Sequence, residues 1–291
     1  MEPAELQRRS EVGEGPARYV IELRREDFSA VYPGMNRYVL TVTAGDRPVA
    51  RFVTNNYEYS PRVPLEAERV ALELFSDWER RLREDPAGFI ADQKPEPPRP
   101  VPSGHTDLVF VQGSPRGDGN CSILAEWAAD AARNTGRTAQ VIYPHDLDIR
   151  CCIGCYQCYN TGHCVFDDDM AGIIDAIRGA AVVIVCSPVY TNTVPGGLKL
   201  MIDRFQAYHA ERVLVGKKTG QTGLVFGVAG RKGEDNFTCV RLVLSAFLRN
   251  IGIRPSGEIL IDGIDAVRDI RTLPGMEEKV RALVQQALAG H

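Results

Sequence analysis

Residues 108–122 read Leu108-Val-Phe-Val-Gln-Gly-Ser-Pro-Arg-Gly-Asp-Gly-Asn-Cys-Ser122, an apolar run that passes into a glycine-rich loop. Glycines let backbone N–H groups close on an anion, and a helix that starts after the loop adds its dipole. The glycines at 113, 117 and 119 do not match G-x-G-x-x-G, and no Gly-Lys-Ser/Thr closes a P-loop. The stretch therefore predicts a phosphate-binding turn between a strand and a helix. The alternative is a tight turn without a ligand.

The chain that surrounds this loop alternates short apolar runs with stretches of helical periodicity. Strands are predicted at 108–111, 138–143, 181–186, 223–228 and 258–261, and helices at 120–133, 168–178, 195–208, 236–250 and 275–288. Five apolar strands that alternate with helices predict an α/β domain, a parallel sheet covered on both faces with right-handed crossovers. Periodicity alone leaves open whether the strand order is flavodoxin-like or Rossmann-like.

The region before the loop has a different pattern. Residues 1–18 are expected to form a loose arm, 19–23 a strand, and 38–43 and 49–53 a hairpin around Ala44-Gly-Asp-Arg47. Apolar residues recur at helical spacing from Leu65 to Asp85. We predict a small α+β module over 1–93, a stiff Pro-rich linker over 94–105, and the main domain over 106–291. The module is expected to be a cap or a dimerisation element; the alternatives are a docking domain or a lid.

Composition excludes several classes of protein. The chain has 291 residues, a net charge of −4, 44% hydrophobic and 25% charged residues, so no strong positive charge favours nucleic acid or an anionic membrane. The longest apolar run, 180–186, is too short to span a bilayer. Residues 1–5 lack a basic region followed by an apolar one, so we expect no signal peptide. Clustered thiols without a secretory signal then indicate a cytoplasmic protein.

A second stretch carries unusual chemistry. Five of the eight cysteines lie between Cys151 and Cys164, and the cysteines at 152, 155, 158 and 164 have the spacing C-x2-C-x2-C-x5-C. Four thiolates at this spacing suit a [4Fe–4S] cluster. Structural zinc usually uses two knuckles further apart, and a radical SAM site needs a barrel rather than five strands. The other alternative is a covering loop whose cysteines hold nothing.

Other residues near the cysteines have simpler interpretations. His163 is expected to be a polar loop residue, and Asp167, Asp168 and Asp169 to cap the following helix. Cys186 in a strand and Cys239 on a core helix are expected to be inert hydrophobic residues.

Four stretches resemble the flavodoxin-like NAD(P)H-dependent FMN reductase family over roughly residues 106–290. The loop Gly113-Ser-Pro-Arg-x-x-x-Asn120 is similar to its phosphate loop, and the cysteine run through Asp168-Asp-Met170 resembles, more narrowly, the iron–sulfur flavoprotein branch. The segments Ser187-Pro-Val-Tyr190 with Gly197…Arg204, and Ala229-Gly-Arg231, resemble the segments after the third and fourth strands. Cys121 departs from the Thr or Ser that is usual there, and a thiol is a poor phosphate donor.

The resemblance implies a flavodoxin-like sheet with FMN at its C-terminal edge. The phosphate would lie in the turn formed by Ser114, Arg116, Asn120, Cys121 and Ser122. The isoalloxazine edge would be lined by Pro188, Val189, Tyr190, Thr191, Asn192, Ala229, Gly230 and Arg231. Cys152, Cys155, Cys158 and Cys164 would bind the cluster, with Cys151 as the alternative first ligand. No residue is expected to act as a nucleophile, since no Ser-His-Asp set or carboxylate pair is evident.

Three functions remain open. The first is an FMN-dependent oxidoreductase in which a [4Fe–4S] cluster exchanges electrons with FMN, and NAD(P)H or reduced ferredoxin is the donor. The second is a cluster-free NAD(P)H-dependent reductase of free flavin, quinones or nitro compounds. The third is a non-enzymatic redox carrier. The expected partner is a small-molecule acceptor or a redox protein, and the resemblance implies a homodimer or homotetramer.

Overall fold

The computed structural model describes residues 4–14, 18–60, 62, 65–93, 105–216 and 220–291. The chain divides into two compact units. The N-terminal unit consists of Met1–Arg99 together with Ile153–Val165, and the C-terminal unit of Pro100–Cys152 together with Phe166–His291. The cysteine segment 153–165 thus belongs to the N-terminal unit, which the sequence did not indicate. Most of the predicted linker, 94–104, lies outside the described residues.

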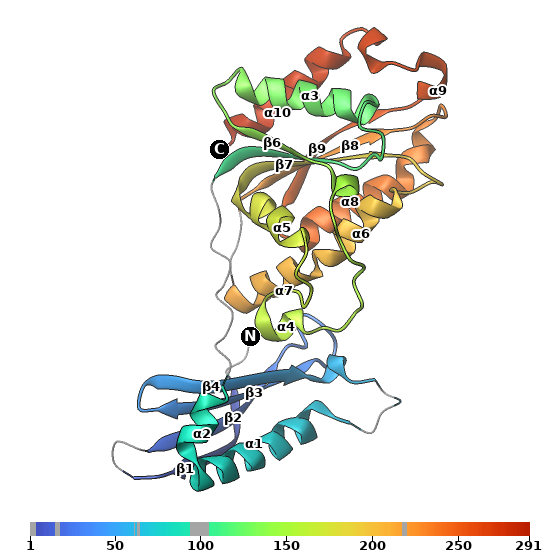
Figure 1. The fold of residues 1–291 in the computed structure, drawn as a ribbon. Coiled ribbons are helices and arrows are strands. Elements are labelled where there is room, and N and C mark those ends of the chain that lie inside the picture. The colour runs from blue at the N-terminus through green and yellow to red at the C-terminus, as the bar shows by residue number, and fades with distance from the viewer. Residues whose placement is uncertain (1–3, 15–17, 61, 63–64, 94–104, 217–219) are drawn as a thin grey trace. The chain divides into compact units, whose positions relative to one another are not determined.

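The N-terminal unit is a four-stranded antiparallel sheet with helices against one face (Figure 1). Its strands β1 (Glu5–Val12), β2 (Tyr19–Asp27), β3 (Asn36–Ala44) and β4 (Arg47–Asn55) follow in sequence order. Helix α1 (Ala67–Glu84) buries Ala67, Ala71, Phe75, Trp78 and Leu82, a stripe with spacings of three and four residues. Helix α2 (Pro86–Ala91) adds Phe89, whose ring meets Trp78 edge-on at 5.5 Å.

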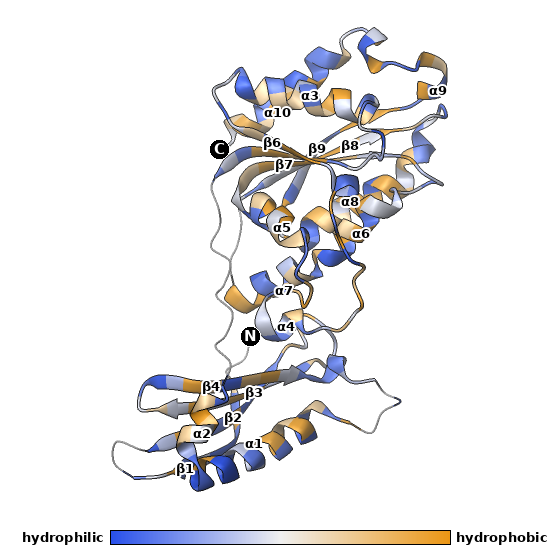
Figure 2. Ribbon diagram, viewed as in Figure 1, coloured by the Kyte–Doolittle hydropathy of each residue, from blue (hydrophilic) through white to orange (hydrophobic). Residues whose placement is uncertain are grey.

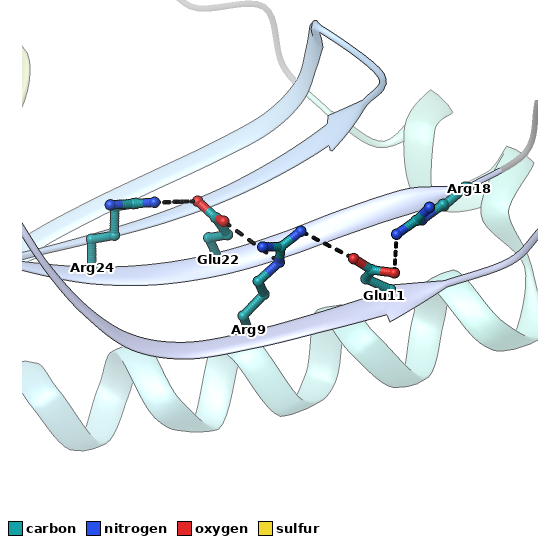
Figure 3. A network of polar contacts seen from close by, with 5 residues as sticks. All are labelled: Arg9, Glu11, Arg18, Glu22 and Arg24. Carbon is teal, nitrogen blue, oxygen red and sulfur yellow. Dashed lines mark hydrogen bonds and ion pairs between the residues drawn. The ribbon is translucent and has the colours of Figure 1, made fainter.

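Strand β1 corrects the prediction of a loose arm over residues 1–18. Its sequence is polar and largely exposed, so it has no apolar alternation that would signal a strand. Backbone pairing with β2 forms it, supported by a row of ion pairs through Arg24, Glu22, Arg9, Glu11 and Arg18 (Figure 3). Exposed pairs contribute only about 0–1 kcal/mol each, but a charged edge strand also opposes pairing with other chains.

The C-terminal unit is a five-stranded parallel sheet of order β6-β5-β7-β8-β9. The strands are β5 (Thr106–Gln112), β6 (Ala139–Ile142), β7 (Ala180–Pro188), β8 (Thr222–Val228) and β9 (Arg254–Ile261). Numbered within the unit, this order is 2-1-3-4-5, the flavodoxin-like order. Figure 2 shows hydrophobic residues along the central strands, as expected for a sheet buried on both faces. The predicted α/β fold with a flavodoxin-like sheet is confirmed.

Helices cover both faces of this sheet (Figure 1). Helices α3 (Asn120–Arg133) and α10 (Met276–Ala289) pack together on one face. The other face carries α5 (Met170–Gly179), α6 (Gly196–Arg204) and α8 (Thr238–Asn250), and α7 (Gln206–Val215) follows α6 on the side away from the sheet. The helix predicted at 195–208 is in fact two helices, α6 and α7, which meet at Phe205. Among the described residues, no helix has both the length and the apolar character that a membrane crossing requires.

Gly113, directly after β5, is required for this packing. A Cβ atom at this position would lie 2.4 Å from Cδ2 of Leu198 and 2.7 Å from the carbonyl oxygen of Cys186. The loop therefore passes too close to β7 and α6 for any larger residue. This close approach sets where the glycine-rich loop leaves the sheet.

Candidate functional site

A cavity of about 850 Å³ opens at the C-terminal edge of the parallel sheet. Its walls come from the loops that follow β5, β7, β8 and β9. This is the edge at which ligands bind in open α/β sheets, and the volume is in the range of about 300–1,000 Å³ for ligand pockets. The structure brings all the predicted flavin contacts to this cavity except Ser122. Their roles toward FMN stay a prediction.

Gln112 organises the loop after β5. Its buried side-chain amide donates to the Arg116 carbonyl at 3.1 Å and to Oγ of Ser122 at 2.9 Å, and its Oε1 accepts from the backbone N–H of Ser114 at 2.6 Å. Oγ of Ser114 accepts from the N–H of Arg116 at 3.2 Å. The loop is thus held in shape by the protein itself. Sequence reasoning missed Gln112, because a polar residue at the end of an apolar strand gives no sign of what it contacts.

Besides Ser114, two more predicted phosphate contacts have partners within the protein. The hydroxyl of Ser122 is buried against Gln112. The side chain of Asn120 donates to the Arg268 carbonyl at 2.9 Å and accepts from the Ile270 N–H at 3.1 Å. Asn120 therefore joins the start of α3 to the segment 268–270. The first-turn amides of α3 still provide the donors that any helix N-terminus offers to an anion.

The segment after β7 forms a tight turn at the edge of the cavity. Tyr190 and Thr193 exchange backbone hydrogen bonds at 2.8 and 3.0 Å, and the two residues between them, Thr191 and Asn192, have φ angles of +46° and +62°. Positive φ at both central positions is the geometry of a type I′ turn. For the β-branched Thr191 this conformation costs about 1–3 kcal/mol, and such strain is found preferentially at ligand sites.

The loops after β8 and β9 pack against each other. Ile264 N–H donates to the Ala229 carbonyl at 3.1 Å, and Asp265 N–H donates to the Gly230 carbonyl at 3.0 Å. A Cβ atom on Gly230 would lie 2.5 Å from a carboxylate oxygen of Asp265, so a larger residue there would require the exposed Asp265 side chain to move. The segment after β9 also supplies Ile264, Asp265, Arg268, Asp269 and Arg271 to the cavity. None of these was predicted, since the segment contains no phosphate-loop motif.

Charged side chains of both signs line the cavity. Arg271 is paired with Asp269, with the closest N–O distance 2.6 Å. Among the described residues, Arg116 has no carboxylate within ion-pair distance, and its side chain is exposed in the loop after β5, where it lines the cavity. Arg116 is therefore a cationic group that is available to an anionic ligand at α3, and Arg231 and Arg268 line the same cavity.

The cysteine segment has little regular structure. Helix α4 (Cys158–Thr161) is a single turn, ended by Gly162 at φ +83°, and Gly154 and Tyr156 also have positive φ. Cys151 and Cys152 are exposed, Cys155 and Cys164 are half-buried, and Cys158 is buried. No three Cys, His, Asp or Glu side chains in the described part of the chain are grouped as a metal site. The donor types and their spacing suit an iron–sulfur cluster, but these thiols are not gathered around one point.

Both ends of the cysteine segment are held in the C-terminal unit by one ion pair. Arg204 donates to the two carboxylate oxygens of Asp168 and, at 2.7 Å, to the Arg150 carbonyl. Asp168 also accepts from the N–H groups of Arg150 and Met170 at 3.1 and 3.2 Å. Burial raises the pKa of Asp168, but the hydrogen bonds from Arg204 and Arg150 outweigh it, so the net shift lowers this pKa. Asp169 is the N-cap residue of α5 but makes no side-chain capping bond, since its carboxylate accepts from the N–H of Asp148 at 2.8 Å. The capping prediction is therefore wrong for Asp169, and Asp168 reaches only the first helical N–H, that of Met170, besides its stronger partner Arg204.

The remaining cysteines differ in burial. Cys186 is fully buried beside Cys121, and burial raises the pKa of its thiol well above its usual value. The prediction of a buried, inert Cys186 agrees with this. Cys239 is exposed on α8, so its placement in the core was wrong. Val240, Leu244, Phe247 and Leu248 face the core, and Cys239 lies outside that stripe.

The amino-acid sequence is similar to one known protein family and to several curated proteins. The family described as NADPH-dependent FMN reductase matches residues 106–240. An iron–sulfur flavoprotein of Archaeoglobus fulgidus is 33% identical over 51% of this chain and 65% of its own length. One from Methanosarcina thermophila is 30% identical over 39% of this chain and 59% of its own length. The chain thus spans about three fifths to two thirds of these relatives.

Solved structures show more distant likeness. A flavodoxin from the domain Archaea aligns with a TM-score of 0.41 and 15% identity, over 64% of this chain and 98% of its own. A flavone reductase aligns with a TM-score of 0.47 and 12% identity, over 64% of this chain and 62% of its own. With TM-scores below 0.5, these two structures carry no argument about this protein.

Proposed function

We propose that this chain is an FMN-dependent oxidoreductase that binds FMN in the cavity at the sheet edge, and the match of residues 106–240 to the NADPH-dependent FMN reductase family supports this. The observation that carries the proposal is the convergence of the loops after β5, β7 and β8 on one cavity of about 850 Å³. FMN accepts two electrons together and can pass them on singly, and the protein supplies its binding and orientation.

The residues of the cavity have separable tasks in this proposal. The loop shaped by Gln112 and the start of α3 would bind the phosphate, and Arg116 would supply a charge-assisted contact. The strained turn at Thr191 and Asn192 would line the ring edge together with Tyr190. No described side chain needs to act as a nucleophile. NAD(P)H or reduced ferredoxin is the proposed electron donor, and a small molecule or a redox protein the acceptor.

A [4Fe–4S] cluster bound by Cys152, Cys155, Cys158 and Cys164 is the second part of the proposal. It is supported by the C-x2-C-x2-C-x5-C spacing and by the name iron–sulfur flavoprotein that several relatives share. Cys151 is the alternative first ligand. The cluster would add a group that exchanges single electrons with FMN.

A cluster-free NAD(P)H-dependent reductase is the second candidate, and one observation favours it. Within the described residues the thiols of the segment are not grouped as a metal site, with Cys158 buried and Cys152 exposed. The acceptors of such a reductase would be free flavin, quinones or nitro compounds.

One experiment tests both candidates. The full chain is purified without oxygen, and its FMN, iron and sulfide contents are measured together with the visible spectrum. Flavin bands with a broad shoulder near roughly 400 nm, together with iron and sulfide, would support the cluster. Bound flavin without iron or sulfide would support the second candidate, the cluster-free NAD(P)H-dependent reductase. Absence of bound FMN, with no uptake on titration, would contradict both.

A further inference from the structure

The N-terminal sheet contacts the cysteine segment through a buried polar network. Asn55, at the end of β4, is fully buried, and its Nδ2 donates to Oδ1 of Asn160 in α4 at 2.9 Å and to the Tyr156 carbonyl at 3.3 Å. Asn160 is itself 5% exposed. Both residues belong to the N-terminal unit, and α4 lies beside β4 (Figure 1).

Glu58 completes this network. Its Oε1 accepts from the N–H of Asn55 at 2.9 Å, from Nδ2 of Asn55 at 3.1 Å, and from Nδ2 of Asn160. Burial raises the pKa of Glu58 above its usual value, which reflects a carboxylate removed from water. Removing one partner of a buried polar group is costly because the other loses its compensation, so the network specifies one placement of α4 on the sheet.

Four tyrosine rings surround the same contact. Tyr32 meets Tyr156 and Tyr159 edge-on at 5.6 and 5.4 Å, and Tyr57 lies 5.1 Å from Tyr156. Tyr156 and Tyr159 belong to the cysteine segment, Tyr32 to the loop between β2 and β3, and Tyr57 to the short 3-10 helix (Asn56–Glu58) that follows β4. Tyr159 is fully buried. Hydrophobic contact therefore surrounds the polar network, and Cys158, between Gln157 and Tyr159, is 9% exposed.

We infer that the N-terminal sheet fixes the position of the cysteine segment. Asn55, Glu58 and Asn160 are the positioning residues, and they place Cys158 for its role as a ligand. The placement of Cys158 stands on the contacts above, and its role as a ligand rests on the proposed function. This assigns a task to residues 1–93, which lie outside the part of the chain that the reductase family matches.

The test measures how fast Cys158 is alkylated in the full, reduced, metal-free chain. Peptide mass spectrometry follows N-ethylmaleimide labelling, and the exposed Cys151 in the same molecule is the reference. Asn160→Ala and Glu58→Ala are expected to raise the rate ratio Cys158/Cys151 at least about tenfold, because each removes hydrogen bonds to a buried group. Glu58→Gln keeps the acceptor oxygen and is expected to stay within about twofold of the native ratio.

Thr161→Ala is the matched control. Thr161 lies in the same segment but is exposed, and its hydroxyl donates to the Gln157 carbonyl within that segment. An unchanged ratio in Asn160→Ala, or an equal rise in Thr161→Ala, would overturn the inference.

Hydrogen exchange on the native chain gives a test that needs no variant. The amides of Asn160 and Gly162 donate within α4 at 2.9 and 2.8 Å, and they are expected to be protected as strongly as those of β3 and β4. Exchange at the rate of an unstructured loop would overturn the inference even if a variant failed to fold.

A spectroscopic measurement connects the inference to the cluster. In chains reconstituted with iron and sulfide, Asn160→Ala and Glu58→Ala are expected to change the reduction potential and the electron paramagnetic resonance spectrum, and Glu58→Gln to leave both as in the native chain. Unchanged spectra in Asn160→Ala would overturn the role of the network toward the ligand. Absence of iron from the native chain would contradict the cluster while the alkylation ratios still decide the placement of Cys158.

Discussion

Arg204 donates to both carboxylate oxygens of Asp168, at 2.6 and 3.0 Å, in an ion pair whose side chains are 1% and 0% exposed. The pair joins α6 to the residues on either side of the cysteine segment, since Arg204 and Asp168 also hydrogen-bond the backbone of Arg150. A buried pair of this kind determines where a segment lies more than how stable the protein is.

Removing one member of this pair is therefore expected to be costly. Arg204→Met leaves the carboxylate of Asp168 buried without its partner, and we expect the free energy of unfolding to fall by about 3–5 kcal/mol. The double variant Arg204→Met/Asp168→Asn is expected to lose less, because the charge is gone. Urea denaturation at neutral pH measures both.

The exposed pair Lys199–Asp203 on the same helix is the control. Its side chains are 48% and 49% exposed, and Lys199→Met is expected to cost less than about 1 kcal/mol. A double variant as unstable as Arg204→Met alone would contradict the account of the buried charge.

Arg116 is expected to contact the phosphate of FMN and not the riboflavin part of the molecule. Arg116→Ala removes a charge-assisted hydrogen bond, so its affinity for FMN is expected to fall about ten- to hundredfold. Its affinity for riboflavin, which lacks the phosphate, is expected to be unchanged. Fluorescence titration of the flavin-free chain with each ligand gives the two constants. Equal losses for both ligands would refute this role.

Asn120→Ala is expected to weaken the binding of FMN and riboflavin equally. Its side chain joins α3 to residues 268–270, which form one wall of the cavity, so its loss should loosen that wall. FMN and riboflavin are then expected to lose the same factor, about three- to tenfold. A loss confined to FMN would instead show that Asn120 contacts the phosphate.

Asp107 is expected to make the stability of the C-terminal unit depend on pH. Its carboxylate accepts from the Thr138 N–H, from the Thr138 hydroxyl and from Arg137, each at 2.8 Å, and these bonds hold its pKa well below the usual range. The stabilisation is present above the unfolded-state pKa of about 4 and is lost as the pH falls toward the folded-state pKa.

We therefore expect Asp107→Asn to lower the free energy of unfolding by about 1–3 kcal/mol at pH 7, and by progressively less below about pH 4. Urea denaturation at several pH values measures this difference. Asp235→Asn, an exposed position on the same unit, is the control and is expected to have little effect. A difference that does not change with pH would argue against the carboxylate as its source.

Prediction succeeded where the cause is local. The five strands of the main sheet follow from short apolar runs, and the helix at 120–133 from its periodicity, both of which the structure confirms. The loop from Gly113 to Asn120 lies at the cavity because a strand end and a helix start must adjoin there. Strand β1 was missed because its polar residues form a strand only against the backbone of β2.

The amino-acid sequence by itself determined the alternation of strands and helices, the glycine-rich turn and the spacing of the four cysteines, because periodicity and glycine act over a few neighbouring residues. Only the tertiary structure decided which polar groups become partners. Asn120 meets Arg268 from 148 residues away, and Asn55 meets Asn160 from 105 residues away. Both pairs form where the packed elements bring two polar groups within hydrogen-bond distance, which is obligatory for buried groups such as Asn55 and Asn160, and no local pattern in the sequence indicates the partner.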